Sequence, residues 1–166
     1  TAEIAVKAAL TGHLVLSTLH TNDAPSTVSR LMNMGIEPFL VASSVNLICA
    51  QRLVRRVCAK CKVPHPLPPQ ALVDIGFSPE DAHTVVPMRG TGCDGCNHTG
   101  YKGRVGLHEL LVGSDMIKKQ IQEHARVAEL LATGLNEGMV TLKMDGIQKV
   151  LQGITDIKQI RAVCIK

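Results

Sequence analysis

The chain has 166 residues, of which 45% are hydrophobic, 19% are charged and 2% are aromatic, and its formal net charge is +4. This apolar content excludes a disordered chain, and the few aromatic residues exclude a stacking platform for single-stranded nucleic acid. The most apolar run, residues 39–50, is too short to span a bilayer. No targeting segment opens the chain, so we expect a cytoplasmic protein.

The first part of the chain predicts an alternation of helices and strands. Residues 2–10 have apolar positions at helical spacing. The continuous apolar run 14–19 predicts a strand buried on both faces of a parallel sheet. Asp23 is placed to cap the next helix. The alternation predicts an α/β fold.

Two further elements precede the cysteines. Glu37-Pro38 predicts the start of a helix over residues 38–48, and residues 51–57 predict a strand. The period of two along this strand places Leu53 and Val57 on one face.

Four cysteines form the most specific pattern. Cys58 and Cys61 make one Cys-x-x-Cys pair, Cys93 and Cys96 make another, and 31 residues separate the pairs. Each pair supplies half of a tetrahedral Zn²⁺ site, and this is the interpretation that we favour. A disulfide framework and a redox Cys-x-x-Cys are the alternatives.

The remainder predicts a strand over residues 104–112, followed by helices. Apolar stripes include Ile117 with Ile121, and either Thr155 or Asp156 is placed to cap a last helix.

Polar residues follow the predicted strand 14–19. Ligands of open parallel sheets bind beyond the carboxyl ends of strands, so His20, Thr21 and Asn22 could contact a phosphate. Spacing alone favours the simpler interpretation that His20 and Asn22 are turn and capping residues. Gln51 and Arg52 begin an arginine-containing stretch that could bind phosphate or form solvated surface. No phosphate-loop motif, Gly-x-x-x-x-Gly-Lys-[Ser/Thr], occurs in the chain.

Residues 11–23, Thr-Gly-His-Leu-Val-Leu-Ser-Thr-Leu-His-Thr-Asn-Asp, resemble the histidine box of the ATPases of type II secretion and type IV pilus assembly. Residues 50–55 resemble the segment that follows it, and residues 92–106 resemble the second zinc knuckle of this family. Gly138-Met139 and residues 153–155 match its C-terminal helical region. The resemblance covers nearly the whole chain, and the four cysteines are similar to those of export and pilus-extension motors rather than retraction motors.

The resemblance implies a RecA-like ATPase core, a homo-hexamer, Mg²⁺-ATP and partner platform proteins at the inner membrane. It implies that His20 senses the γ-phosphate as the catalytic residue. Thr21, Gln51 and Arg52 would contact nucleotide, and Cys58, Cys61, Cys93 and Cys96 would hold Zn²⁺. The protein would be cytoplasmic and peripheral to the inner membrane.

The resemblance also divides the chain into three parts. Residues 1–57 would be the C-terminal portion of the RecA-like core, residues 58–103 an inserted zinc subdomain, and residues 104–166 a return strand with a helical subdomain. The phosphate loop and acidic boxes of the family would precede Thr1, so we expect residues 1–166 alone to be inactive. The alternative function is a zinc-ribbon module that docks protein or nucleic acid, although few aromatics and the mild charge disfavour nucleic acid.

Overall fold

The computed structural model describes residues 1–164, which form helices and strands in two compact units. The first unit comprises residues 1–50 and 109–140, and the second comprises residues 51–108 and 141–166. This mixture of elements fits the predicted α/β class. In the described part of the chain, no helix is long and apolar enough to cross a membrane.

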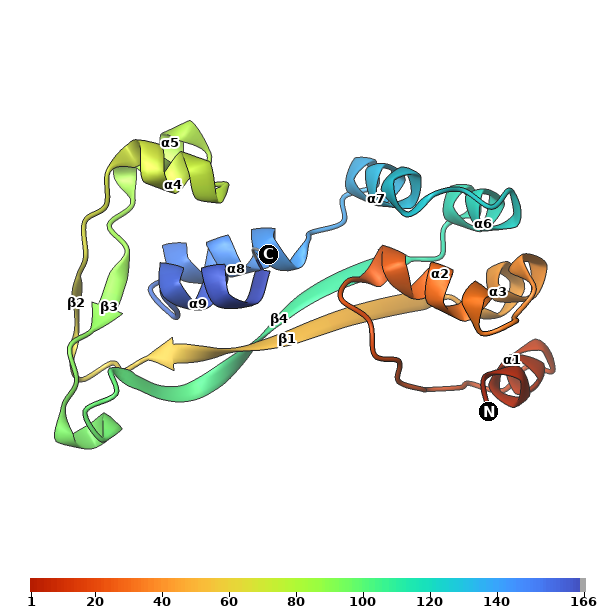
Figure 1. Cartoon of the computed structure of the whole chain (residues 1–166), viewed down its shortest axis with the longest axis horizontal. Helices are drawn as coiled ribbons and strands as arrows, with labels where there is room; N and C mark the ends of the chain where they lie inside the picture. The colour runs from red at the N-terminus through yellow and green to blue at the C-terminus, as the bar shows by residue number, and fades with distance from the viewer. Residues whose placement is uncertain (165–166) are drawn as a thin grey trace. The chain divides into compact units, whose positions relative to one another are not determined.

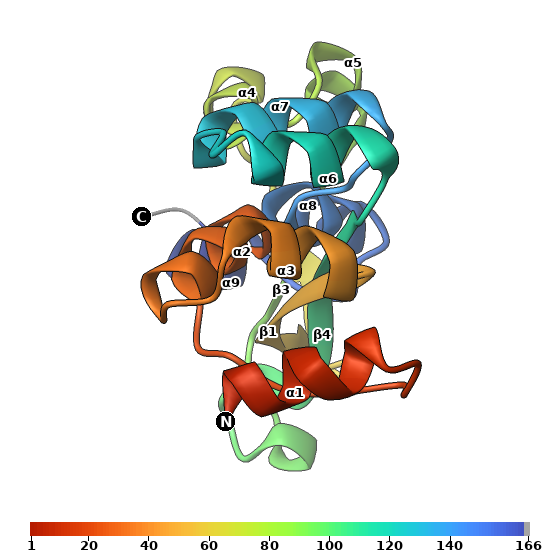
Figure 2. The same cartoon turned by 90° about the vertical axis from the view of Figure 1, so that its right-hand side faces the viewer.

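The first unit is mostly helical. It contains α1 (Ala2–Leu10), α2 (Ala24–Asn33), α3 (Pro38–Ser44), α6 (Asp115–Gln122) and α7 (Val127–Asn136). Helix α3 packs against α6, and α2 packs against α7, as Figure 2 shows from the end of the strands. The core between these helices is aliphatic and includes Val28, Val41, Leu111, Ile117 and Leu130.

The two longest strands of the described residues pair with each other. Strand β1 (Leu47–Val57) pairs with β4 (Tyr101–Val112). The backbone N–H of Gly113 donates to the Asn46 carbonyl at one end of the pair, and the N–H of Cys58 donates to the Gly100 carbonyl at the other. These bonds show that the two strands are antiparallel.

The second unit adds a small hairpin and four helices. Strands β2 (Lys62–Pro64) and β3 (Met88–Gly90) pair antiparallel, with Val63 opposite Arg89. Between them lie α4 (Pro69–Ile75) and α5 (Pro79–Thr84), and after β4 come α8 (Leu142–Leu151) and α9 (Ile157–Cys164). Figure 1 shows α8 and α9 beside the part of the strand pair that belongs to this unit.

Helices α2 and α9 begin at capping residues that the sequence predicts. Asp23 Oδ1 accepts a hydrogen bond from the N–H of Ser26 at the start of α2. Asp156 Oδ1 accepts one from the N–H of Gln159 in the first turn of α9. These carboxylates satisfy N–H groups that have no partner inside the helix, so the local sequence signals at both ends are confirmed.

Two expectations about the elements are wrong. Residues 14–19 form no strand, and Leu14 and Leu16 are 89% and 87% exposed. Within residues 1–164, the strand pairs are β1 with β4 and β2 with β3, so no described strand satisfies the backbone of this segment. Helix α3 ends at Ser44, and β1 begins at Leu47 instead of residue 51.

Burial along β1 is not the same for all of its apolar residues. Leu53 is 55% exposed, whereas its neighbour Val54 is 1% exposed. The buried face is the one that carries Ala50 and Val54. Val57 at the strand end is also buried, so burial along β1 does not strictly alternate.

A polar network joins the start of β4 to the start of α9. The Tyr101 hydroxyl donates to Asp156 Oδ2 at 2.5 Å, and the Thr155 hydroxyl donates to the Arg55 carbonyl at 2.8 Å. The Arg55 guanidinium lies 4.2 Å from the centre of the Tyr101 ring, within cation–π range. Thr155 is fully buried, and Asp156 is 7% exposed, so α9 is tied to the strand pair by satisfied polar groups.

Tyr101 is the only tyrosine of the chain, which makes this network measurable. Burial and the hydrogen bond to the Asp156 carboxylate raise the pKa of Tyr101 to about 12. We expect the phenolate absorbance of the folded protein to appear at a pH about two units higher than in urea, where tyrosine has a pKa of about 10. The stabilisation is fully present below about pH 10 and is lost as the pH rises through about 12.

The Asp156→Asn variant tests the cause. It keeps an acceptor for the hydroxyl but removes the negative charge, so the ionisation of Tyr101 moves back toward that of a free tyrosine. A folded protein whose phenol titrates like the unfolded chain would contradict this account of the network.

Candidate metal centre and the His20 segment

The four cysteines come from two loops that the fold brings together. Cys58 follows directly after β1, and the N–H of Cys61 donates to the Cys58 carbonyl across a tight turn. Cys93 directly precedes a short 3₁₀ turn, η1 (Asp94–Cys96), and Cys96 is the last residue of that turn. The N–H of Thr91 donates to the Cys61 carbonyl and fastens the second loop to the first. The two Cys-x-x-Cys turns therefore face each other.

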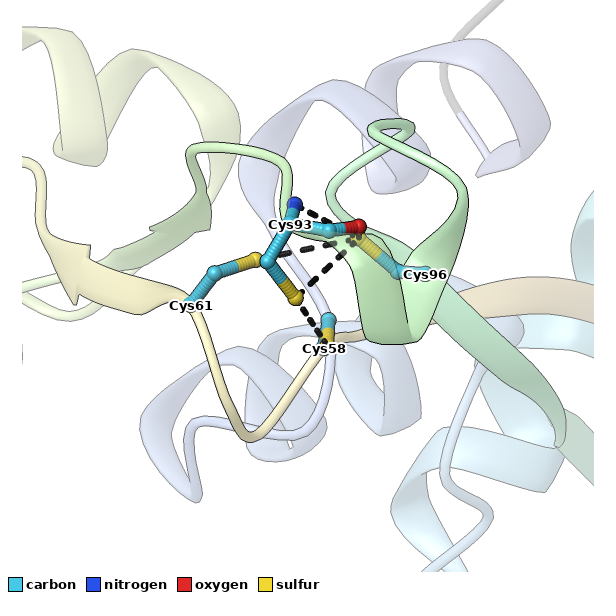
Figure 3. A group of neighbouring side chains, drawn as sticks. All are labelled: Cys58, Cys61, Cys93 and Cys96. Carbon is cyan, nitrogen blue, oxygen red and sulfur yellow. Dashed lines mark hydrogen bonds between the residues drawn. The ribbon is translucent and has the colours of Figure 1, made fainter.

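The sulfur atoms are spaced as ligands of one metal ion. The Sγ–Sγ distances are 3.9 Å for Cys58–Cys93, 3.9 Å for Cys61–Cys96 and 3.8 Å for Cys93–Cys96. All four Sγ atoms lie within 4.8 Å of one another, and Figure 3 shows the four side chains pointing toward one another. A tetrahedron with metal–sulfur bonds of about 2.3 Å has edges of about 3.8 Å, so this donor set fits a tetrahedral metal ion.

These distances do not fit a disulfide, whose sulfur atoms are bonded at about 2.05 Å, and all four cysteines are free. Cys58 and Cys96 are buried, while Cys61 and Cys93 are partly exposed. Across residues 1–164, no other group of three or more His, Cys, Asp or Glu side chains converges in this way.

Backbone N–H groups donate hydrogen bonds to two of the sulfurs and so stabilise negative charge on them. Cys96 Sγ accepts hydrogen bonds from the N–H of Cys93 at 3.2 Å and of Gly100 at 3.3 Å, and Cys61 Sγ accepts one from Gly92 at 3.3 Å. Burial raises the pKa of Cys96, but the N–H donors together with hydrogen bonds from the Cys93 and Cys61 side chains outweigh it and lower that pKa to about 6. Burial is also the main reason that the pKa of Cys93 is raised to about 11. Of Cys93 and Cys96, Cys96 is therefore the sulfur better stabilised as a thiolate.

Two glycines allow the chain to cross itself beside the cluster. A Cβ on Gly90 would lie 2.0 Å from the Gly100 carbonyl oxygen, and a Cβ on Gly100 would lie 2.6 Å from the Gly90 oxygen. Gly100 also has φ +77°, in the left-handed region. No side chain fits between these two backbones, so the crossing that orders the second cysteine loop requires glycine at both positions.

The His20 segment belongs to the first unit and approaches the start of α2. His20 is exposed, and the hydroxyls of Thr21 and Thr27 lie 2.7 Å apart. The Thr27 hydroxyl donates to the Asp23 carbonyl at 3.2 Å. These contacts hold the residues after His20, while its imidazole remains open to solvent. A contact between His20 and a nucleotide stays a prediction.

The other predicted nucleotide contacts, Gln51 and Arg52, lie on β1 in the second unit. Gln51 is exposed and Arg52 is partly buried. Their role, like that of Thr21, stays a prediction.

Sequence reasoning missed Glu109, a carboxylate that is only 4% exposed. Its Oε1 accepts a hydrogen bond from the N–H of Ala24 at 2.9 Å. The two residues are 85 positions apart in the sequence, and no local pattern links a strand residue to a distant helix start. The one signal in the sequence is the period of two along the strand, which places Glu109 on the same face as Leu107 and Leu111, both of which are buried.

A mixed α/β chain whose four cysteines converge on one point defines the class of an α/β protein with a candidate metal site. Comparison with known proteins makes the class specific. The profile of the family described as Type II/IV secretion system protein matches residues 1–162, and the chain belongs to this family.

Curated relatives agree with this assignment. The chain is 52% identical over 161 residues to the Type IV pilus assembly ATPase PilB of Myxococcus xanthus, covering 96% of the chain and 28% of that protein. It is 44% identical over 164 residues to the Type II secretion system protein E of Aeromonas hydrophila, covering 98% and 32%. It is 43% identical over 163 residues to the Type II secretion system ATPase E of Vibrio cholerae, covering 98% and 32%. The chain thus spans about a third or less of these relatives.

Proposed function

We propose that this chain is the C-terminal part of a hexameric ATPase that powers type II protein secretion or type IV pilus assembly. The observation that carries the proposal is its 43–52% identity to ATPases of both systems over nearly the whole chain. The four-cysteine cluster adds support, because its spacing fits the metal site that the resemblance implies. The binding-module alternative explains the cysteines but not this identity.

We propose that Cys58, Cys61, Cys93 and Cys96 hold Zn²⁺ in a structural site. Four thiolates fill a tetrahedral shell and leave no position for a reactive water. The metal would contribute folding free energy, since it would join two loops from distant parts of the sequence. In this proposal, residues 58–103 form the metal subdomain between a RecA-like portion, residues 1–57, and a strand-and-helix portion, residues 104–166.

We propose that ATP and Mg²⁺ bind mainly to residues outside these 166, since the chain contains no phosphate-loop motif. His20 would sense the γ-phosphate, with Thr21, Gln51 and Arg52 near the nucleotide. The hexamer would be cytoplasmic, peripheral to the inner membrane, and would engage the membrane platform proteins of the secretion or pilus machinery. Nucleic acid is not an expected partner.

The role of His20 is tested in the full-length protein. We expect His20→Ala to lower ATP turnover about 100-fold, the scale of losing one group that stabilises transition-state charge, with little change in thermal unfolding because the side chain is exposed. His83→Ala, an exposed histidine on α5, is the control and should retain full turnover. Unchanged turnover in His20→Ala would refute the assignment.

Purified residues 1–166 are expected to show no ATPase activity above background, because no phosphate loop is present to position the β- and γ-phosphates. Release of inorganic phosphate with Mg²⁺-ATP is the measurement, and the full-length protein is the positive control. Robust metal-dependent turnover by residues 1–166 would show that the nucleotide site is complete within them and would overturn this part of the proposal.

A further inference from the structure

Glu109 is a buried carboxylate that nothing in the proposed function uses. It lies on the inner face of β4 in the first unit and is 4% exposed. A carboxylate is seldom buried unless its negative charge is compensated. Here the compensation includes the first N–H of α2, because the N–H of Ala24 donates to Glu109 Oε1 at 2.9 Å.

The start of α2 therefore has two carboxylate acceptors of different origin. Asp23 Oδ1 accepts from the N–H of Ser26 and is local, whereas Glu109 comes from a distant strand. Both carboxylates lie at the helix N-terminus, where the aligned peptide dipoles favour negative charge. The local cap fixes the shape of the first turn, and Glu109 fixes the place of that turn against β4.

The segment held in this way leads directly from His20. Thr21 contacts the partly buried side of α2 through the Thr27 hydroxyl, which in turn donates to the Asp23 carbonyl. His20 itself is exposed and is the first residue before these anchors. A shift of the α2 start relative to β4 would consequently move the point at which the imidazole is attached.

We propose that Glu109 is a positioning residue that fixes the loop carrying His20. The inference rests on the proposed function only for its effect on ATP turnover; the hold on the loop can be measured without nucleotide. Glu109 touches no reacting atom in this account and acts through the backbone of Ala24.

The first measurement is amide hydrogen exchange in the chain of residues 1–166. Glu109→Gln keeps one side-chain oxygen as an acceptor but loses the negative charge, and we expect it to speed exchange of the Ala24 amide about tenfold. Glu109→Ala, which has no acceptor, should speed this exchange further. Exchange of the Ser26 amide should also become faster, but by a smaller factor. Glu129→Gln is the matched control, since Glu129 accepts the Arg126 N–H at the start of α7. It should leave both α2 amides unchanged.

The second measurement separates a positioning role from a merely structural one. In the full-length protein, Glu109→Gln should lower kcat about tenfold with little change in KM. Added to His20→Ala, the same change should lower kcat no further, because it acts through His20. Equal α2 exchange in wild type and both Glu109 variants, or fully additive losses of kcat in the double variant, would overturn the proposal.

Failure of the proposed function gives a different pattern. If His20→Ala alone leaves turnover unchanged, the γ-phosphate role of His20 is wrong, and the exchange of the Ala24 amide still decides whether Glu109 holds the loop. The Gln variant keeps the volume of the buried side chain, so the exchange measurement does not depend on the Ala variant folding.

Discussion

Replacement of Cys96 by serine is expected to release the metal and to disorder the loops that carry the cysteines. Cys96 Sγ accepts two backbone hydrogen bonds and lies 3.8–3.9 Å from the sulfurs of Cys93 and Cys61. Apparent binding free energies of structural Zn²⁺ are about 10–16 kcal/mol. Loss of about 5 kcal/mol of that stabilisation lowers Tm by about 10–20 °C in a protein of this size.

Bound metal per chain and thermal unfolding measure this effect. Wild type should hold about one Zn²⁺, and Cys96→Ser should hold little. Cys49→Ser is the matched control, because Cys49 is an exposed thiol on β1 outside the cluster. It should retain both the metal and the wild-type Tm. A Cys96→Ser protein with full metal content and unchanged Tm would show that the cluster is not a structural site, and a different metal in wild type would correct its identity.

A methyl group at the glycine crossing is expected to be the most damaging small substitution. The Gly90→Ala Cβ would lie 2.0 Å from the Gly100 oxygen, in backbone that no side-chain rotation can move. We expect a loss of more than about 3 kcal/mol in the free energy of unfolding, since overpacking alone typically costs about 1–3 kcal/mol. Metal content should fall with it, because the crossing precedes and follows the Cys93–Cys96 loop.

Two further variants separate steric clash from backbone strain. Gly138 has φ +95°, and a methyl group there would meet nothing within 4 Å, so Gly138→Ala carries strain alone and should cost about 1–2 kcal/mol. Gly100→Ala combines φ +77° with a contact of 2.6 Å and should be as severe as Gly90→Ala. Denaturant unfolding gives the three values, and equal small losses for all of them would mean that the backbones can separate freely.

Local features of this protein were determined by the sequence because their causes are local. The caps at Asp23 and Asp156 depend on residues within the same helical turn, and both are confirmed. The Cys-x-x-Cys spacing likewise fixes each pair of sulfurs on one turn. The family resemblance was also readable from short motifs and is confirmed by the match over residues 1–162.

Tertiary structure decided the features that depend on which surfaces meet. An apolar run such as residues 14–19 becomes a strand only if another strand satisfies its backbone, and no described strand lies beside it. The buried face of β1 is set by its partners, which cover Val54 and leave Leu53 exposed. Glu109 and Ala24, 85 residues apart, form a hydrogen bond because the fold brings this residue of β4 to the start of α2. Sequence spacing describes neighbours along the chain, whereas such burial is a property of contacts across it.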